Sequence, residues 1–596
     1  MKQADIVVPI AFKHTDTGYC TPRWFVEYSN YHPVPATFEP LINGEEAFRA
    51  VHEAIAGAQK SIDIICWGFQ PSMYFVRDGK SPSIGQLLRL KAAQGVEVRV
   101  LGWEAPGNLA GGGGEANLPG KRQYFRRTME DIDRALQSST DEQYERDLAW
   151  FRDCETNDGK PVARTKDRRP LFVSRGFSMH ERWRIYKDVS ENSVDSNISG
   201  PMLAALAGAT THHQKSVLVD YELPEHAVGF VMGHNMLDEY WDTNAHSAKN
   251  RTASTKPAPD RGPRGFGPRQ DISSRVTGPI LEHLHHNFAT AWQKETSEDL
   301  LTLRKAKEVG KQLRPQGPPL MAQLLRTQAQ EGLREIEKLY LQAVNNATQF
   351  IYIENQYFRW PPLAEAIKRA ALAQTTNGRD PGVHGVLHLF VVTNVTDDGI
   401  GQGTVKTQLM LESLGRADTI PEVTKLQRID KARRKSTPYD PRDRLRAAKL
   451  NEEIKEINES TIHPEEIPGL KVHVCSLVAD DSPAGQPWMP VYIHTKLMIV
   501  DDVFTTIGSA NINTRSMQVD TELNIAHEWG NVTTEMRRQL WGLHTGKMGG
   551  QDDPSEAFSQ WRFLLAEDTR LQKDCEPPCC PLVEFRYTNP VLSNLD

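Results

Sequence analysis

The sequence predicts an α/β protein built from two similar halves. Three observations support this fold class. A helix-then-strand pattern occurs twice, a His-x-Lys-x4-Asp motif occurs twice, and a polar stretch with Pro and Gly separates the copies. Self-similarity of this extent indicates an internal repeat, so we expect the two halves to fold alike.

The helix-then-strand pattern lies upstream of each motif. Residues 47–69 read AFRAVHEAIAGAQKSIDIICWGF, and residues 333–358 read LREIEKLYLQAVNNATQFIYIENQYF. In both segments apolar residues first recur at helical spacing and then form a short run of branched side chains, in which Ile62 and Ile351 hold equivalent places. We therefore predict an amphipathic helix followed by a buried strand in each half.

The motif in the second half reads HTKLMIVD and begins an apolar run. His494 and Lys496 lie on one face of the predicted strand because side chains alternate along a strand, and the run ends at Asp501. A single His-x-Lys on a strand usually marks a solvated edge, since most charged side chains are exposed. This copy alone is therefore weak support for a functional site.

The first half repeats the motif, and the repetition favours a functional site. His213, Lys215 and Asp220 have the spacing of the later copy, with an apolar run again linking the lysine to the aspartate. A second short apolar run follows in each half and leads to small and amide residues. These are Gly233 and Asn235 in the first half, and Gly508, Ser509 and Asn511 in the second.

Two histidines and two lysines suit the cleavage of a phosphodiester. Lysine is a permanent cation that pairs with phosphate, and histidine titrates near about pH 6.5. If the halves bring the histidines together, one can attack phosphorus while the other protonates the leaving oxygen and then activates water or an alcohol. The lysines, with Asn235, Ser509 and Asn511, would hold the phosphoryl oxygens. This chemistry requires no metal cofactor, although a bound divalent cation such as calcium is left open.

The paired motifs resemble those of the phospholipase D superfamily. Four further stretches are similar to segments of that family: YIENQYF at 352–358, YWDT at 240–243, DISSRVTGP at 271–279 and NTRSMQVDTE at 513–522. The resemblance implies two αβα sandwich domains with mixed β-sheets, related by a pseudo-twofold axis, with the active site at their interface.

Carried over by position, the resemblance also implies roles for the motif residues. His213 would be the nucleophile and His494 the general acid and base. Lys215 and Lys496 would bind phosphate.

The resemblance assigns supporting roles to four carboxylates. Asp242 and Glu522 would each orient a histidine by accepting a ring N–H, whereas Asp220 and Asp501 would support the site without reacting. The pair Met232 and Gly233 departs from the two small residues that the family usually carries there.

The domain organisation follows from the repeat. We expect a first domain over residues 1–300 and a polar linker over 301–325. A second domain follows over 326–545, with a highly charged insertion at 397–468, and then a C-terminal tail at 546–596. Mixed charge of this kind usually marks a solvated helix, and a partner-binding or lid element is the alternative.

Composition favours a lipid over a nucleic acid as partner. The chain of 596 residues carries a net charge of −7, whereas nonspecific nucleic-acid binders are more often basic. No stretch approaches the roughly 20 apolar residues of a membrane span. The run PMLAALAGA at 201–209 predicts a buried helix or core turn, with an interfacial contact at the active-site mouth as the alternative. No secretory signal is apparent, so we expect a protein that is cytoplasmic in its producer and, if secreted, leaves by a leaderless route.

The seven cysteines do not form a disulfide framework for a chain of this length. Cys575, Cys579 and Cys580 lie in the tail as CEPPCC. The pattern lacks zinc-ligand spacing and predicts free thiols on a surface tail, with a metal site as the alternative.

Three functions compete on the sequence alone. The leading hypothesis is a phospholipase D that hydrolyses the distal phosphodiester bond of membrane glycerophospholipids through a phosphohistidine, in peripheral contact with the membrane. A nuclease or other phosphodiesterase of the same superfamily is the second, and a non-catalytic binding protein on this scaffold is the third. The chain also resembles phospholipase effectors of the bacterial type VI secretion apparatus, which implies an antibacterial toxin with an immunity protein or secretion-apparatus component as partner.

Overall fold

The computed structural model describes most of the chain. The described residues are 6–12, 15–20, 23–105, 117–121, 140–156, 168–196, 198–251, 255–395, 403–435 and 444–594. Parts of the charged insertion, at 397–402 and 436–443, lie outside them.

The first half is built on a mixed sheet whose strands run in the order β6-β5-β4-β7-β8-β10-β3. The pairs β4–β5 and β5–β6 are parallel, and the remaining pairs are antiparallel. The strands are β3 (Val34–Ile42), β4 (Ser61–Cys66), β5 (Glu97–Trp103), β6 (Leu171–Arg175), β7 (Ser216–Val219), β8 (Val228–Met232) and β10 (Ile272–Thr277).

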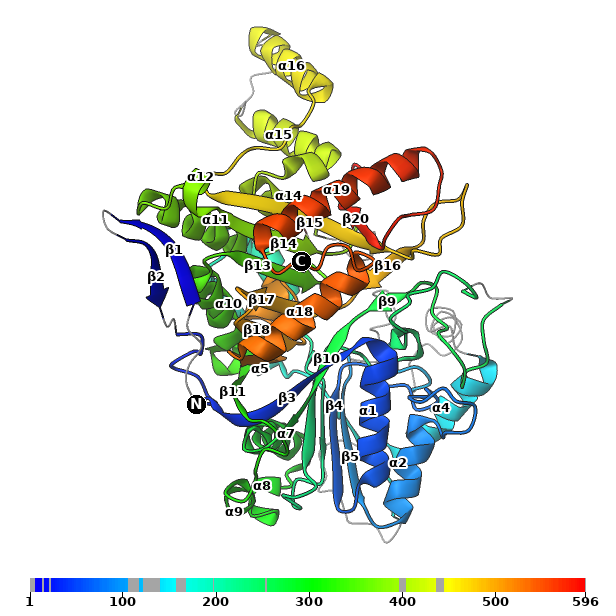
Figure 1. Ribbon diagram of the computed structural model, residues 1–596. Coiled ribbons are helices and arrows are strands. Elements are labelled where there is room, and N and C mark those ends of the chain that lie inside the picture. The colour runs from blue at the N-terminus through cyan, green and yellow to red at the C-terminus, as the bar shows by residue number, and fades with distance from the viewer. Residues whose placement is uncertain are drawn as a thin grey trace.

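Helices cover both faces of this sheet because its strands are apolar on both sides. α1 (Asn43–Gly57) and α2 (Ile84–Ala93) pack on the face of Ile62, whereas α7 (Ile280–Thr296) packs on the face of Ile65. Figure 1 shows these layers around the sheet. The predicted helix and buried strand of the first half are confirmed as α1 and β4.

The second half repeats the topology. Its strands run in the order β15-β14-β13-β17-β18-β19-β11, with the same parallel and antiparallel pairs at equivalent places. They are β11 (Leu320–Gln328), β13 (Phe350–Asn355), β14 (Leu387–Val392), β15 (Leu470–Val478), β17 (Lys496–Val500), β18 (Phe504–Gly508) and β19 (Glu522–His527). The prediction of two similar α/β halves with mixed sheets is therefore confirmed.

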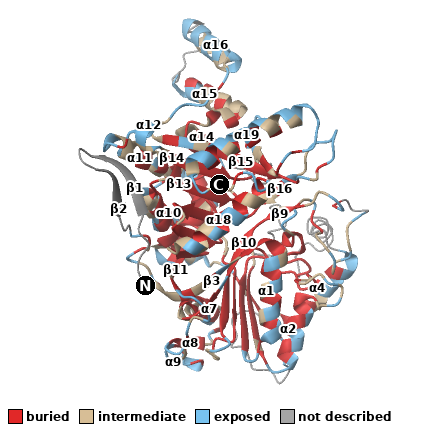
Figure 2. Ribbon diagram, viewed as in Figure 1, coloured by how far each residue is buried: buried red, intermediate tan, exposed pale blue. Residues whose placement is uncertain are grey.

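Helices again lie on both faces of the second sheet. α10 (Glu335–Asn346) and α11 (Pro361–Thr376) share a buried cluster with Ile351, and α18 (Gly530–His544) and α19 (Pro554–Lys573) share one with Tyr352. The helix and strand predicted for this half are α10 and β13. Figure 2 shows the strands of both sheets buried between helices.

The two sheets meet edge to edge. β3 pairs with β10 of the first half and with β11 of the second, so one strand bridges the repeat. A short strand β9 (Arg269–Gln270) also pairs with β16 (Pro490–Ile493). These pairings join the halves beside the segments that carry the motif histidines.

The predicted linker begins against the first half, where α8 (Leu300–Leu303) and α9 (Ala306–Gly310) contact α7, and the predicted tail belongs to the second half. The linker region holds these two helices and the start of β11. The tail region provides α19 and β20 (Leu582–Glu584), which pairs with β15.

The described part of the charged insertion is helical. α14 (Thr404–Ser413) and α15 (Pro421–Lys435) have buried residues, whereas no described side chain of α16 (Arg444–Glu459) is buried. Figure 1 shows α15 and α16 projecting from the body. This agrees with the solvated helix predicted for mixed charge.

Further described elements complete the chain. They are β1 (Ile6–Phe12), β2 (Thr15–Cys20), α4 (Asp141–Cys154), α5 (Met179–Asn192), α6 (Gly200–Gly208), β12 (Leu333–Arg334), α12 (Pro381–His384), α17 (Thr514–Gln518) and 3₁₀ helices at Asp238–Tyr240, Ala329–Glu331 and Ala417–Thr419. Among the helices of the described residues, none has both the length and the apolarity that crossing a bilayer requires.

Candidate active site

His213 is held by the second half of the chain. Its backbone N–H donates to the Thr521 carbonyl at 2.9 Å. Its ring Nδ1 lies 2.9 and 3.0 Å from the two carboxylate oxygens of Glu522, the first residue of β19. A proton on Nδ1 satisfies this carboxylate and leaves the Nε2 lone pair free.

His494 is held in the same way by the first half. Its backbone N–H donates to the Gln270 carbonyl at 2.8 Å, and its Nδ1 lies 2.6 Å from Oδ2 of Asp271. Asp271 directly precedes β10, the strand that corresponds to β19 in the repeat. Each half therefore supplies the carboxylate that orients the histidine of the other half, and neither half holds a complete site.

The sequence prediction that Asp242 orients a motif histidine is wrong, because Asp271 contacts His494 and the histidine beside Asp242 is His246, at 3.6 Å. Asp242 is fully buried and pairs with Arg251 at 2.9 Å. It also accepts the backbone N–H of Arg269 at 2.7 Å. Asp242 thus anchors the loop that leads into Asp271. The signal for the correct residue was the repeat itself, since Asp271 and Glu522 both stand at the head of equivalent strands.

The motif lysines fold back onto their own motifs. Lys215 Nζ donates to the carbonyl of His213 at 2.8 Å, and Lys496 Nζ donates to the carbonyl of His494. Both lysines are buried, so their charges are poorly screened by water. The two lysines and two histidines form one electrostatic unit, because each lysine acts on both rings.

Burial and the lysine charges keep both imidazoles neutral. Burial, followed by Lys215 and Lys496, holds the pKa of His213 well below its usual range. Burial and Lys496 likewise lower the pKa of His494, although Asp271 opposes this shift. Neutral rings have a lone pair to offer, which nucleophilic attack and proton abstraction both require.

The two orienting carboxylates differ in charge. Burial raises the pKa of Glu522 to about 7, against the opposing effects of Lys215 and of hydrogen bonds from Ser509 and Ser516. Burial also acts to raise the pKa of Asp271, but the nearby His234, His494 and Lys496 bring it well below its usual range. At neutral pH Asp271 is ionised, whereas Glu522 is close to its pKa and is only partly ionised.

The predicted phosphate contacts separate into two groups. The hydroxyl of Ser509 donates to Glu522, the carboxylate that holds His213, and its predicted contact with a phosphoryl oxygen stays a prediction. Asn235 and Asn511 are buried, and the side-chain oxygen of each has no hydrogen-bond partner among the described residues. An amide oxygen accepts hydrogen bonds and does not donate them, so these atoms supply no donor to a phosphoryl oxygen, and the phosphate contacts of both residues stay predictions.

The motif aspartates stand at the far ends of their strands from the histidines. Asp220 accepts hydrogen bonds from the backbone N–H groups of Gln59, Lys60 and Ser61. Asp501 accepts them from the corresponding Thr348, Gln349 and Phe350. Both aspartates adopt left-handed backbone conformations, with φ of 54° and 53°. They fix the start of β4 and β13, which fits a supporting role.

The atypical pair Met232 and Gly233 is explained by packing. Met232 is buried in the first-half core and pairs in register with Ser273. A Cβ on Gly233 would lie 2.4 Å from Oδ1 of Asp271. Glycine at this position lets Asp271 approach, while the methionine points away into the core.

Sequence reasoning missed a second buried acid beside His494. Glu354 of β13 accepts hydrogen bonds from Thr495, from the Tyr352 hydroxyl at 2.6 Å and from His544 Nε2 at 2.8 Å. Glu354 is fully buried, so this network fixes the residue next to His494. A glutamate within an otherwise apolar strand was the available signal.

Aromatic rings flank both histidines. Trp67 makes an edge contact with His213 at a centroid distance of 6.2 Å, and Tyr240 makes one with His494 at 4.7 Å. The side chain of His213 is 13% exposed and that of His494 is 2% exposed. His213 is therefore the more accessible of the two to an incoming substrate.

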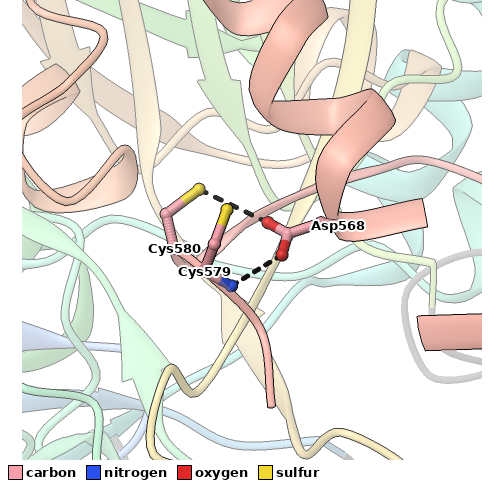
Figure 3. A group of neighbouring side chains, drawn as sticks. All are labelled: Asp568, Cys579 and Cys580. Carbon is pink, nitrogen blue, oxygen red and sulfur yellow. Dashed lines mark hydrogen bonds between the residues drawn. The ribbon is translucent and has the colours of Figure 1, made fainter. Parts of the chain in front are cut away.

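The tail cysteines lie partly in the core. Cys575 and Cys579 are exposed, whereas Cys580 is buried. Cys579 and Cys580 converge on Asp568 of α19, as Figure 3 shows. The prediction of free thiols on a surface tail holds for Cys575 and Cys579. It is wrong for Cys580, because β20, which begins two residues later, pairs with β15 and places Cys580 in the second half.

Comparisons with known proteins agree with the motifs. The family model described as Phospholipase D matches residues 153–360 and 476–567, about half of the chain, and includes both motifs. Phospholipase D alpha 1 of Oryza sativa subsp. japonica is 27% identical over 565 residues, which cover 82% of this chain and 61% of that protein. Phospholipase D alpha 2 of Arabidopsis thaliana is 26% identical over 583 residues, 84% of this chain and 63% of that protein. The chain thus spans less than two thirds of the length of these relatives.

Solved structures are also similar to this chain. Phosphatidylserine synthase of Haemophilus influenzae Rd KW20 matches with a TM-score of 0.40 and 12% identity, covering 91% of this chain and 96% of that one. NucT from Helicobacter pylori matches with a TM-score of 0.20 and 12% identity, covering 37% of this chain and 94% of that one.

Proposed function

We propose a phospholipase D reaction for this chain, which belongs to the phospholipase D family. Its substrate is a membrane glycerophospholipid, and its products are phosphatidic acid and the free head group. The observation that carries the proposal is the reciprocal pairing, in which His213 and His494 from different halves are each oriented at Nδ1 by the other half's carboxylate.

The first step is an in-line attack by His213. Its Nδ1 proton is held by Glu522, so the Nε2 lone pair forms the bond to phosphorus. The bond from phosphorus to the head-group oxygen breaks, and His494 Nε2 donates a proton to that oxygen. The phosphatidyl group is then carried on His213 as a phosphohistidine.

The second step returns the enzyme to its starting state. His494, now neutral, takes a proton from water, and the water oxygen forms a bond to phosphorus as the P–N bond breaks. The products of this step are phosphatidic acid and free His213. An alcohol in place of water would give the corresponding phosphatidyl ester.

The unequal carboxylates support this division of roles. The imidazolium form of His494 is stabilised by the fully ionised Asp271, and an arriving phosphate anion offsets Lys215 and Lys496 and raises the pKa of His494. His213 faces the less charged Glu522 and so stays neutral. A protonated acid and a neutral nucleophile are what the first step needs.

The direct test is lipid mass spectrometry of mixed phospholipid vesicles incubated with the protein and ethanol. We expect phosphatidylethanol, absent with His213→Ala, and the depleted lipid identifies the head group. If a folded protein gives no new lipid, the proposal fails, and single-stranded DNA and RNA become the next substrates for the nuclease alternative.

We also propose that turnover needs no metal ion, since the described site offers nitrogen bases and lysine charges for each step. EDTA should leave most of the activity of the purified protein at 25 °C. Complete loss, restored by a divalent cation, would contradict this proposal. The roles as a secreted antibacterial effector and as a partner of an immunity protein stay predictions from the resemblance.

A further inference from the structure

Helix α5 exposes large apolar side chains along one line. Met179 is 81% exposed, Trp183 57% and Tyr186 41%. Their spacing places them on one side of the helix, here called the α5 stripe. Ile185 and Val189 fill the buried side of the same helix. The helix is therefore apolar on two sides, and packing within the chain accounts for only one of them.

The helix carries three basic and three acidic residues, and cations from other segments pair with two of the acidic ones. Arg184 and Lys187 are exposed, and Lys187 Nζ lies 5.8 Å from the centre of the Trp183 ring. Two acidic residues of the helix are engaged elsewhere, Glu181 with Lys294 and Asp188 with Arg334. The remaining Glu191 lies 3.9 Å from Lys187. Aromatic and apolar side chains beside basic ones suit the boundary between anionic head groups and acyl chains.

The α5 stripe adjoins the segment that carries the nucleophile. The ring of Phe177, two residues before α5, stacks on His212 at a centroid distance of 3.9 Å. Arg182 of α5 donates to the carbonyl oxygens of Ala207 and Gly208 at the end of α6. The chain then runs from α6 directly into His213.

We propose that the α5 stripe inserts into the surface of an anionic phospholipid bilayer and presents the first motif to the lipid head groups. This inference rests on the proposed function and names the surface on which it operates. It accounts for the exposed Trp183 and Tyr186, and for the run PMLAALAGA, which packs its leucines against α5.

The test compares two variants of the full chain. One carries Met179→Ser, Trp183→Ser and Tyr186→Ser. The matched control carries Leu445→Ser and Phe563→Ser, which remove apolar side chains that are 73% and 63% exposed on α16 and α19. Co-sedimentation with phosphatidylcholine–phosphatidylglycerol vesicles measures binding, and turnover is measured on those vesicles and on a monomeric short-chain phospholipid.

We expect the stripe variant to lose at least about tenfold in vesicle binding and in vesicle turnover, with short-chain turnover unchanged and the control like wild type. Equal vesicle binding by the stripe variant and wild type would overturn the inference while leaving the proposed function intact. A wild-type dimer that the stripe substitutions dissociate would overturn it in favour of self-association. Co-sedimentation measures vesicle binding without catalysis. If the wild type cleaves neither lipid, the proposed function is contradicted, whatever the binding result.

An independent observation concerns the thiols at the end of α19. The carboxylate of Asp568 and the sulfurs of Cys579 and Cys580 lie within 4.8 Å of one another. Cys580 Sγ donates to Asp568 Oδ2 at 3.4 Å, and the backbone N–H of Cys579 donates to Oδ1 at 2.7 Å. The chain bends at Cys579 and Cys580, and both sulfurs face the carboxylate (Figure 3).

We infer that this cluster binds a thiophilic divalent cation such as Zn²⁺. Two sulfurs and one carboxylate oxygen are ligands that zinc accepts, and a water would complete a tetrahedral set. Cys579 is exposed, which gives the ion a route in. The ion would tie α19 to the segment before β20, and it takes no part in the histidine chemistry.

Cobalt substitution in the full chain tests this site. Co²⁺ should produce a thiolate-to-metal charge-transfer band with wild type and with the matched control Cys575→Ser, which removes an exposed thiol outside the cluster. The band should disappear in Cys579→Ser and in Cys580→Ser, and Zn²⁺ should raise the wild-type Tm. A band that persists in Cys579→Ser, or no band with wild type, would overturn the site. Since Cys579 is exposed, its variant is informative even if Cys580→Ser does not fold.

Discussion

The half-sites around His213 and His494 have the same backbone and different electrostatics. The backbone N–H of each histidine donates to a carbonyl of the other half, and its ring contacts a carboxylate at the head of an equivalent strand. The carboxylate beside His213 has its pKa raised to about 7, whereas the one beside His494 has its pKa held well below the usual range. A duplicated fold can therefore place two histidines and two carboxylates at equivalent positions while the surrounding side chains give the carboxylates different pKa values.

The physical cause lies in what else contacts each carboxylate. Asp271 has His234 nearby in addition to His494 and Lys496, and it accepts the Ile272 N–H at 2.8 Å. Glu522 accepts hydrogen bonds from the neutral hydroxyls of Ser509 and Ser516. These offset less of the rise in pKa that burial causes. The position of Ser509 is taken by Gly233 in the first half, so Asp271 has no hydroxyl donor from this position.

Replacing the histidines gives the largest expected effect. His213→Ala and His494→Ala should each lower turnover by at least about a thousandfold, with the fold retained by circular dichroism. The two variants should differ on a substrate with a good leaving group, such as a p-nitrophenyl ester. His494→Ala should release one equivalent in a burst and accumulate phosphohistidine, whereas His213→Ala should show no burst. Near-normal turnover in either variant would contradict the two-histidine scheme.

Asp271→Asn should come next, with a loss of about 100- to 1,000-fold in kcat and a small change in KM, because the wrong tautomer of His494 is then favoured. Asp242→Asn is the matched control among buried carboxylates. It should lower the Tm and keep kcat within a few-fold. Steady-state kinetics, at a temperature below the unfolding transitions of both variants, compare their kcat values. Equal losses in kcat would indicate that Asp242 also orients a motif histidine.

The free energy of unfolding should depend on pH in opposite directions for Glu522 and Asp271. Because the folded pKa of Glu522 is raised from 4.5 to about 7, its stabilising contribution is full below pH 4.5 and is lost as pH rises through 7. The free energy of unfolding of wild type relative to Glu522→Gln should thus fall by roughly 3 kcal/mol over this range.

Asp271 should show the opposite trend, because its folded pKa is depressed. Its contribution is present above the unfolded value of 3.8 and is lost as pH falls through the lower folded value. Urea denaturation of wild type, Glu522→Gln and Asp271→Asn from about pH 2 to pH 8 measures both trends. Parallel curves for wild type and Glu522→Gln would show that the two carboxylates are electrostatically alike.

The smallest effect is expected where the halves are most alike. Asp220→Asn and Asp501→Asn should each lower the free energy of unfolding by about 1–3 kcal/mol, because an amide oxygen accepts the clustered backbone N–H groups less strongly than a carboxylate. The two losses should be similar, and turnover well below the Tm should stay within twofold of wild type. A turnover loss far beyond that would indicate a role in the chemistry.

Much of the site was predictable because the relevant residues form a local pattern that occurs twice. The His-x-Lys-x4-Asp spacing set both histidines and lysines on strands, and the apolar runs identified β4, β7, β13 and β17. The choice of Asp242 over Asp271 was wrong because the partner of His494 is set by the pairing of β9 with β16, a contact between distant segments. Sequence spacing likewise does not reveal that the hydroxyl of Ser509 donates to Glu522.

The sequence by itself determined the duplicated α/β plan, the motif residues and the class of chemistry. These follow from side-chain periodicity and from the fixed charge and titration range of lysine and histidine. Only the tertiary structure decided which carboxylate serves which histidine, which of the two is ionised, and that each half completes the other. Those properties depend on burial and on distances between residues far apart in the chain, and no local pattern encodes them.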